Sequence, residues 1–388
     1  MSPQYYFDHA ASAPRRDEVV DAMAPWSHGV VGNPSGSHRA ARAARRAVEE
    51  ARDEVAAFIG ARASEVIFTG GGTESCHLGV VGVALHHRRH FDATSVVVSQ
   101  VEHHAVLDAA ATLSRDFPDV KVHYVSVDED GVVDLDELAQ LCSATTAVVS
   151  VMTANNETGV CQPLDAITST VFAHVPGGAP VHTDAIAAAP WLHLPTVTAT
   201  AGLVSICAHK IGGPVNSGAL VVREGISLDA LVPGGGQERG RRGGTVDVAA
   251  AVGLAAAVRA TARDLTEVHE RVTDLQLRLA TAMAFLPGAK VTAVGALRLP
   301  GTVHVTFDGL ASDELLFLLD QRGVAAAAAA SCSSGAAQAS HVLSAMGVAP
   351  ERARGAVRLS MGAETTEADV DALILIVADV VRHLRAEG

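Results

Sequence analysis

The sequence lacks the features of a secreted, membrane-spanning or nucleic-acid-binding protein. Its first residues do not form a secretion signal, and its longest apolar runs, at 248–258 and 372–381, are too short to cross a bilayer. Positive charge is also scarce: 29 Lys and Arg residues face 43 Asp and Glu, so the formal net charge is −14. An acidic chain has no bulk electrostatic attraction for nucleic acid or an anionic membrane. We therefore expect a cytoplasmic protein that binds neither directly.

Cysteine is also rare, and the five cysteines are widely scattered. An odd number without a C-x-x-C pair predicts neither a disulfide framework nor a zinc site. The histidine-rich stretch at 86–90 is more typical of a solvated helix end than of a metal site, so no metal is expected. Cys332 is unusual because it lies among alanine, serine and glycine in GVAAAAAASCSSGAA. The local sequence does not decide between a packed thiol and a reactive one.

Aromatic residues make up only 4% of the chain, but 48% of it is apolar, which suits closely packed helices and buried strands. A helix is expected within 33–60, capped by Ser35 or Ser37, and a long one over 250–275. Short β-branched runs separated by helix-length segments predict βαβ units and a mostly parallel sheet covered on both faces. These runs lie at 65–70, 94–100, 146–152, 179–184, 203–209 and 218–225.

Toward the carboxyl terminus, two further runs and a helix indicate a second, smaller unit. The apolar runs at 301–309 and 355–362 alternate with helical segments, and an amphipathic stretch at 367–388 closes the chain. This pattern predicts a smaller α+β domain.

Polar residues follow several of the predicted strands, where ligands bind in parallel sheets. They are Thr73, His103, Asn156, Asp184 and Lys210. Each one alone has a commoner structural explanation, such as a helix cap or a surface residue. Together they would serve pyridoxal phosphate: the lysine bonds to it, the aspartate pairs with its ring nitrogen, and the glycine-rich turn at 69–75 holds its phosphate.

Two neighbouring pairs leave alternatives open for this cofactor. Either His103 or His104 could stack on its ring, and either Asn155 or Asn156 could reach it. The pattern alone does not choose between the members of each pair.

Ten motifs occur in an order that resembles one family almost from end to end. They are FDHAASAP, GNPSGSH, FTGGGTES, VEHHAVL, ANNETGV, HTDA, HKIGGP, GGGQERGRRGGT, SCSSG and VRLSMG. The chain resembles the cysteine desulfurases of the NifS/IscS type. These belong to the class V aminotransferase branch of the fold-type I pyridoxal-phosphate enzymes.

The resemblance implies an α/β fold of two domains. The large pyridoxal-phosphate-binding domain would cover 15–258, with a mostly parallel seven-stranded sheet between helices. The small α+β domain would combine 1–14 with 259–388 and carry the catalytic-cysteine loop at about 325–340. The resemblance also implies a homodimer with shared active sites.

The resemblance assigns a role to each site residue. Lys210 would bond to the cofactor and move the substrate α-proton, Asp184 would pair with the pyridine nitrogen, and His103 would stack on the ring as an acid/base. Cys332 would be the nucleophile. The phosphate would be held by Gly72, Thr73 and His209, and by Thr245 of the other subunit. The substrate carboxylate would be bound by Asn156 and Arg358.

The implied activity converts L-cysteine to L-alanine and leaves a persulfide on Cys332 for an acceptor protein. Alternatives on the same scaffold are another carbon–sulfur or carbon–selenium lyase acting on a modified cysteine, or a non-catalytic partner subunit. Two positions depart from the family pattern: Ala187 replaces a glutamine, and Cys207 replaces a serine or threonine at the phosphate. Each loses a polar contact worth about 1 kcal/mol, so we expect weaker cofactor retention or altered electronics of the bond between Lys210 and the cofactor.

Overall fold

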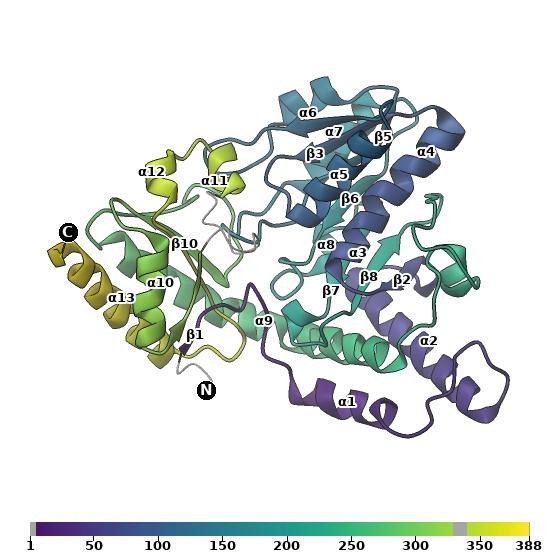
Figure 1. Cartoon of the computed structure of the whole chain (residues 1–388), viewed down its shortest axis with the longest axis horizontal. Helices are drawn as coiled ribbons and strands as arrows, with labels where there is room; N and C mark the ends of the chain where they lie inside the picture. The colour runs from purple at the N-terminus through teal and green to yellow at the C-terminus, as the bar shows by residue number, and fades with distance from the viewer. Residues whose placement is uncertain (1–4, 329–339, 388) are drawn as a thin grey trace.

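The structure is a computed structural model that describes residues 5–328 and 340–387. Within these residues, a large sheet of seven strands forms the centre of one lobe (Figure 1). In spatial order its strands are β2 (Val66–Thr69), β8 (Gly218–Val222), β7 (Leu203–Cys207), β6 (Val181–Asp184), β5 (Thr146–Ser150), β3 (Ser95–Ser99) and β4 (Lys121–Val125). Only β8 runs against its neighbours. The predicted, mostly parallel seven-stranded sheet is therefore confirmed.

Helices cover both faces of this sheet because its strands are apolar on both sides. Val96, Val98 and Val148 pack against the helices within 72–116, whereas Val97 and Val149 pack against the helices within 135–174. The helices of this lobe are α1 (Asp17–Ser27), α2 (Arg39–Ile59), α3 (Gly72–His77), α4 (Val83–Phe91), α5 (His104–Asp116), α6 (Leu135–Leu141), α7 (Leu164–His174) and α8 (Leu194–Val197). Shorter turns are η1 (Ala63–Glu65), η2 (Leu78–Gly82, a π turn), η3 (His209–Ile211) and η4 (Gln237–Gly240).

A second lobe contains the predicted smaller α+β unit. Among the described residues it has a four-stranded antiparallel sheet and a two-stranded parallel one. The first consists of β12 (Ala327–Ala328), β13 (Ala356–Ser360), β10 (Thr302–Phe307) and β9 (Ala289–Val291), and the second of β1 (Tyr5–Tyr6) and β11 (Val324–Ala325). Its helices are α10 (Ser312–Gln321), α11 (His341–Ala345), α12 (Pro350–Ala353) and α13 (Glu367–Glu387).

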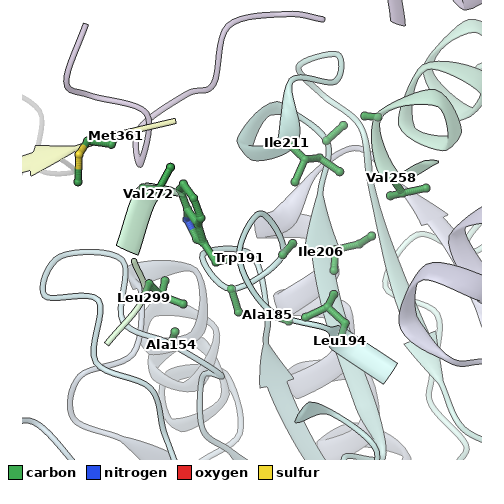
Figure 2. Packing of buried hydrophobic residues seen from close by; sticks show 14 of the residues in the cluster. Ala154, Ala185, Trp191, Leu194, Ile206, Ile211, Val258, Val272, Leu299 and Met361 are labelled. Atoms are coloured by element: carbon green, nitrogen blue, oxygen red, sulfur yellow. The ribbon is translucent and has the colours of Figure 1, made fainter. Parts of the chain in front are cut away.

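The long helix α9 (Val248–Ala284) connects the two lobes and shares one core with both (Figure 1). Its first half is rich in alanine and contains Gly253, so α1 packs closely: a Cβ at Gly253 would lie 2.7 Å from Met23 Sδ. Figure 2 shows Val258 on the side of Ile206 and Ile211, and Val272 on the side of Trp191. The helix passes residue 258 without interruption, so the predicted domain division falls inside it and stays a prediction.

The predicted helix cap at Ser35 or Ser37 is wrong. Helix α2 begins at Arg39, and His38 caps it by accepting a hydrogen bond from Ala41 N at Nδ1 (3.3 Å). The start is delayed because Asn33 Oδ1 accepts a hydrogen bond from Ser35 N (2.9 Å), which forms a turn before the helix.

Strand β4 was not predicted. Its sequence, KVHYV, is polar and half-exposed because the strand lies at the edge of the sheet. Within the described residues, no helix has both the length and the apolar character needed to cross a membrane.

A buried ion pair joins α2 to η4. Both Arg52 Nη atoms lie 2.8 Å from the Glu238 carboxylate, and neither side chain is more than 4% exposed. We expect Arg52→Met to lower the free energy of unfolding by about 3–5 kcal/mol, because Glu238 would be left buried without its partner. Urea denaturation measures this loss, and it should be smaller in Arg52→Met/Glu238→Gln. A single variant as stable as the original chain would contradict it.

Candidate active site

The carboxyl ends of six strands of the large sheet meet at one edge, because only β8 is reversed. At this edge lies a cavity of about 450 Å³. Its lining brings together these predicted site residues: Gly72, Thr73, His103, Asn156, Asp184, Cys207, His209, Lys210 and Arg358.

Lys210 follows β7 in the tight turn η3. The turn ends at Gly212, whose φ of 77° suits glycine, and a Cβ there would lie 2.9 Å from Pro14 O. The Lys210 Nζ donates hydrogen bonds to the carbonyl oxygens of Ala10 (2.5 Å) and Ala11 (2.8 Å). The amino-terminal segment therefore orients the amine, through a contact between lobes that no sequence pattern indicated.

Asp184 ends β6 and is 5% exposed. Its Oδ1 accepts a hydrogen bond from Ile186 N (2.9 Å), and the buried Cys76 thiol also hydrogen-bonds to the carboxylate. Burial raises the pKa of Asp184, while electrostatic interactions with His103 and Lys210 oppose the rise. A cationic group in the cavity would favour the ionised form in the same way.

The structure separates the two neighbouring histidines. His103 lines the cavity and caps α5, and its Nδ1 accepts a hydrogen bond from Ala105 N (3.0 Å). Burial lowers the pKa of His103, an effect that Asp184 opposes. The proton of its neutral ring therefore lies on Nε2. His104 is exposed, with its ring 4.8 Å from that of His341.

The two asparagines are separated in the same way. Asn155 is buried; it donates to Val101 O (2.9 Å) and accepts from the N–H groups of Glu157 and Thr158. Those bonds use its amide to shape the loop after β5. Asn156 lines the cavity.

The turn between β2 and α3 forms the other end of the cavity. Gly71 has a φ of 140°, and a Cβ at Gly72 would lie 2.3 Å from Ile186 Cδ1, so the turn needs glycine at both positions. The helical run 72–91 starts here, and its first N–H groups have no intrahelical acceptors. This geometry suits an anion.

Cys207 and His209 lie beside this turn and are both uncharged near neutral pH. Burial raises the pKa of the Cys207 thiol to about 12 and, with the charge of Lys210, lowers the pKa of His209 to about 4. The Cys207 Sγ is 3.9 Å from His209 Nε2. An anion bound here would therefore be held by hydrogen bonds and by the N–H groups at the start of the helix, and not by charge on Cys207 or His209.

Arg358 extends from β13 into the cavity and is 3% exposed. Its Nη2 donates to Asp8 Oδ1 (2.9 Å) and its Nη1 to Asn156 O (2.9 Å), whereas Nε is buried without a hydrogen-bond partner. Asp8 was given no role from the sequence, although it belongs to the motif FDHAASAP. A buried guanidinium with an unused donor suits a carboxylate ligand.

Three predicted positions remain, Ala187, Thr245 and Cys332. Ala187 lines this cavity and also a neighbouring one of about 60 Å³. Thr245 is exposed and is not part of the lining. Cys332 lies outside the described residues. The roles assigned to all these residues stay predictions.

Comparison with known proteins establishes the class. Residues 5–373 match the family Aminotransferase class-V, so the chain belongs to this family, as the motif order indicated. The family implies pyridoxal phosphate as its cofactor.

Particular relatives match the chain over nearly its whole length. It is 40% identical over 394 residues to the "IscS-like cysteine desulfurase" of Mycobacterium tuberculosis, covering 98% of this chain and 97% of that protein. It is 35% identical to the "Cysteine desulfurase IscS" of Methanosarcina thermophila, covering 98% and 92%. The solved structure of a "NifS-like protein" superposes with a TM-score of 0.89 at 32% identity, covering 98% and 99%.

The residues around the cavity fit pyridoxal phosphate. An amine (Lys210), a buried carboxyl (Asp184) and an imidazole (His103) share the lining with the glycine turn that opens a helix. These are the groups needed to bond an aldehyde, pair with a ring nitrogen and hold a phosphate. The unused Arg358 Nε leaves a donor for a second anion, such as a substrate carboxylate.

Glu157 is buried close to Arg358, and its Oε2 accepts a hydrogen bond from Ser340 Oγ (2.6 Å). Burial raises the pKa of Glu157 to about 7, although Ser340 and Arg358 favour the ionised form. A carboxyl group whose pKa is higher in the folded than in the unfolded chain stabilises the fold while it is protonated. This stabilisation is complete below pH 4.5, the pKa in the unfolded chain, and is lost as the pH rises through 7.

We expect Glu157→Gln to remove that loss. Between pH 4.5 and 7 the unfolding free energy of the original chain should fall, relative to the variant, by about 3 kcal/mol. Urea denaturation at several pH values measures the difference between the two profiles. Parallel profiles would show that Glu157 does not titrate in this range.

Proposed function

We propose that this chain is an L-cysteine desulfurase, which converts L-cysteine to L-alanine and transfers the sulfur through a persulfide on Cys332 to an acceptor protein. The observation that carries the proposal is the single cavity that joins Lys210, Asp184, His103 and Arg358. The full-length similarity to proteins named cysteine desulfurase supports it.

Lys210 and Asp184 would hold pyridoxal phosphate, the lysine through its amine and the aspartate through its buried carboxylate. When bound, the cofactor would supply an electron sink that weakens the bonds at the substrate Cα and Cβ. Lys210 would also accept the proton from the substrate Cα. The carbonyl oxygens of Ala10 and Ala11 hold its Nζ and so orient it for this work.

The remaining residues would act on the substrate. Arg358 would bind the α-carboxylate through its unused Nε, with Asn156 beside it. His103 would exchange protons at Nε2, because its Nδ1 is occupied by Ala105 N. The Cys332 thiolate would attack the substrate sulfur: a sulfur–sulfur bond forms, the Cβ–sulfur bond breaks, and its electron pair stays with the carbon fragment, which is protonated and leaves as alanine.

The proposal includes a cytoplasmic homodimer whose two subunits share their active sites. Thr245 is exposed and outside the lining of its own protomer's cavity, which is consistent with a contact to the phosphate held by the partner. The large domain, 15–258, would carry the cofactor and the small domain, 1–14 with 259–388, the nucleophile. Ala187 and Cys207 provide no amide or hydroxyl to the cofactor, so we keep the expectation of weak retention.

Incubation of the purified protein with pyridoxal phosphate and L-cysteine tests the proposal. We expect L-alanine and, once a thiol reductant is added, an equal amount of sulfide. S-methyl-L-cysteine is the control: its methylated sulfur should not form a persulfide on Cys332. Failure to form alanine from L-cysteine in the presence of the cofactor would refute the proposal.

A further inference from the structure

The 234–244 segment, which precedes α9, has an unusual backbone. Seven of its eleven residues have φ values between 46° and 150°: Gly234, Gly235, Gly236, Glu238, Arg239, Gly240 and Gly244. Glu238 and Arg239 are consecutive non-glycine residues in the left-handed region, a conformation that persists only where neighbouring contacts enforce it. The shape of this segment therefore depends on its side-chain contacts.

Two of those contacts attach the segment to β2 and to the turn that follows it. Glu238 accepts a hydrogen bond from Phe68 N (2.8 Å). Arg242 forms a two-pronged ion pair with Glu74, with Nε 2.8 Å from Oε1 and Nη2 3.2 Å from Oε2. Glu74 Oε2 also accepts a hydrogen bond from Gly70 N (2.6 Å). Glu74 thus holds the turn and the segment at the same time.

Only one end of this connection lies at the cavity. Gly72 and Thr73, on the turn, line the cavity of their own protomer. Thr245 comes three residues after Arg242, is exposed, and lies outside that cavity's lining. Glu74 and Arg242 therefore connect the turn, which lines the cavity, to the segment that leads to Thr245, which does not.

We propose that the Glu74–Arg242 ion pair couples the two cofactor sites of the dimer, so that loading one site raises the affinity of the other. This inference rests on the proposed function, in which Thr245 completes the partner's phosphate site. Neither Glu74 nor Arg242 lines the cavity, so both are positioning residues.

We expect positive cooperativity because the first cofactor to bind would also order part of the second site. An anion bound to the N–H groups of Gly72 and Thr73 fixes the turn, and Glu74 then holds Arg242 and the segment that leads to Thr245. The second cofactor binds to a site whose Thr245 is already ordered, so its binding costs less. The Arg242 and Glu74 side chains are 25% and 31% exposed, so solvent screens the pair and the coupling is modest.

Titration of the cofactor-free, full-length chain with pyridoxal phosphate, followed by absorbance, tests the coupling. We expect the second site to bind about fivefold more tightly than the first. Glu74→Gln, Arg242→Gln and the double variant should each bind more weakly and without cooperativity. The double variant should be no worse than either single one, because all three remove the same interaction. Arg88→Gln is the matched control, since it breaks another two-pronged pair, with Asp119 at 2.6 and 2.9 Å.

Titration of the Thr245→Val variant distinguishes a failure of this inference from a failure of the proposed function. If Thr245→Val weakens binding but Arg242→Gln keeps the cooperativity of the original chain, the sites are shared and the coupling is refuted. If Thr245→Val binds as the original chain does, the shared site is refuted and the coupling with it. Non-cooperative binding by the original chain would also overturn the inference.

Discussion

The Lys210→Ala variant is expected to release L-alanine from L-cysteine at least about 10⁴-fold more slowly than the original chain. The amine has two functions in the account, as the attachment point of the cofactor and as the base at the substrate Cα. General acid–base catalysis alone contributes about 10²–10⁴-fold. The variant should also lack the visible absorbance band of covalently bound pyridoxal phosphate.

The chain offers clean controls for this variant because it contains only three lysines, Lys121, Lys210 and Lys290. Lys121 and Lys290 are exposed on β4 and β9, outside the cavity lining. Alanine at either position should leave activity and absorbance unchanged. Borohydride reduction of the cofactor-loaded chain should attach the cofactor to the Lys210 peptide alone. Label on another lysine, or a Lys210→Ala variant with normal activity, would contradict the assignment.

The Cys332→Ala variant is expected to bind the cofactor normally but to form alanine from L-cysteine about 10³-fold more slowly. It loses only the nucleophile that accepts the sulfur, and the loss of a nucleophile typically costs several orders of magnitude. Alanine and sulfide formation, measured with and without a reductant, give the rate.

Cys142→Ala is the matched control for Cys332. Cys142 is buried outside the cavity lining, and burial raises the pKa of its thiol to about 11, so it is a poor nucleophile. Its variant should keep the rate of the original chain. If Cys332→Ala also forms alanine at that rate, the sulfur does not pass through Cys332.

The sequence was most informative where function and fold depend on local pattern. Five of the six β-branched runs, those at 65–70, 94–100, 146–152, 179–184 and 203–209, contain strands that run in the same direction. The polar residues at or after the ends of these runs meet in one cavity. This worked because parallel strands bring their carboxyl ends to the same edge. The order of the ten motifs gave the family, which full-length relatives confirm.

Contacts between distant segments could not be predicted from the sequence. The carbonyl oxygens of Ala10 and Ala11 bind Lys210 although about 200 residues separate them, and Asp8 pairs with Arg358 across 350 residues. Every residue has a backbone carbonyl, so the residue types at positions 10 and 11 could not indicate the contact with Lys210. Asp8 lay in a recognised motif, but only packing of the two lobes reveals its partner.

The choice between neighbouring candidates was also settled by geometry. His103 and His104 are chemically identical, and the start of α5 between them turns one into the cavity and leaves the other exposed. The same holds for Asn155, whose amide is used by the loop after β5, and Asn156. Sequence spacing alone does not fix which of two consecutive side chains faces a ligand.

The central claim is that sulfur leaves L-cysteine in the cavity around Lys210 and reaches Cys332. Mass spectrometry of the cofactor-loaded chain, incubated with L-cysteine and then digested, tests it most directly. We predict that the peptide containing Cys332 gains the mass of one sulfur atom, that a reductant removes it, and that one L-alanine forms for each sulfur added. Formation of alanine with no added sulfur on that peptide would contradict the account.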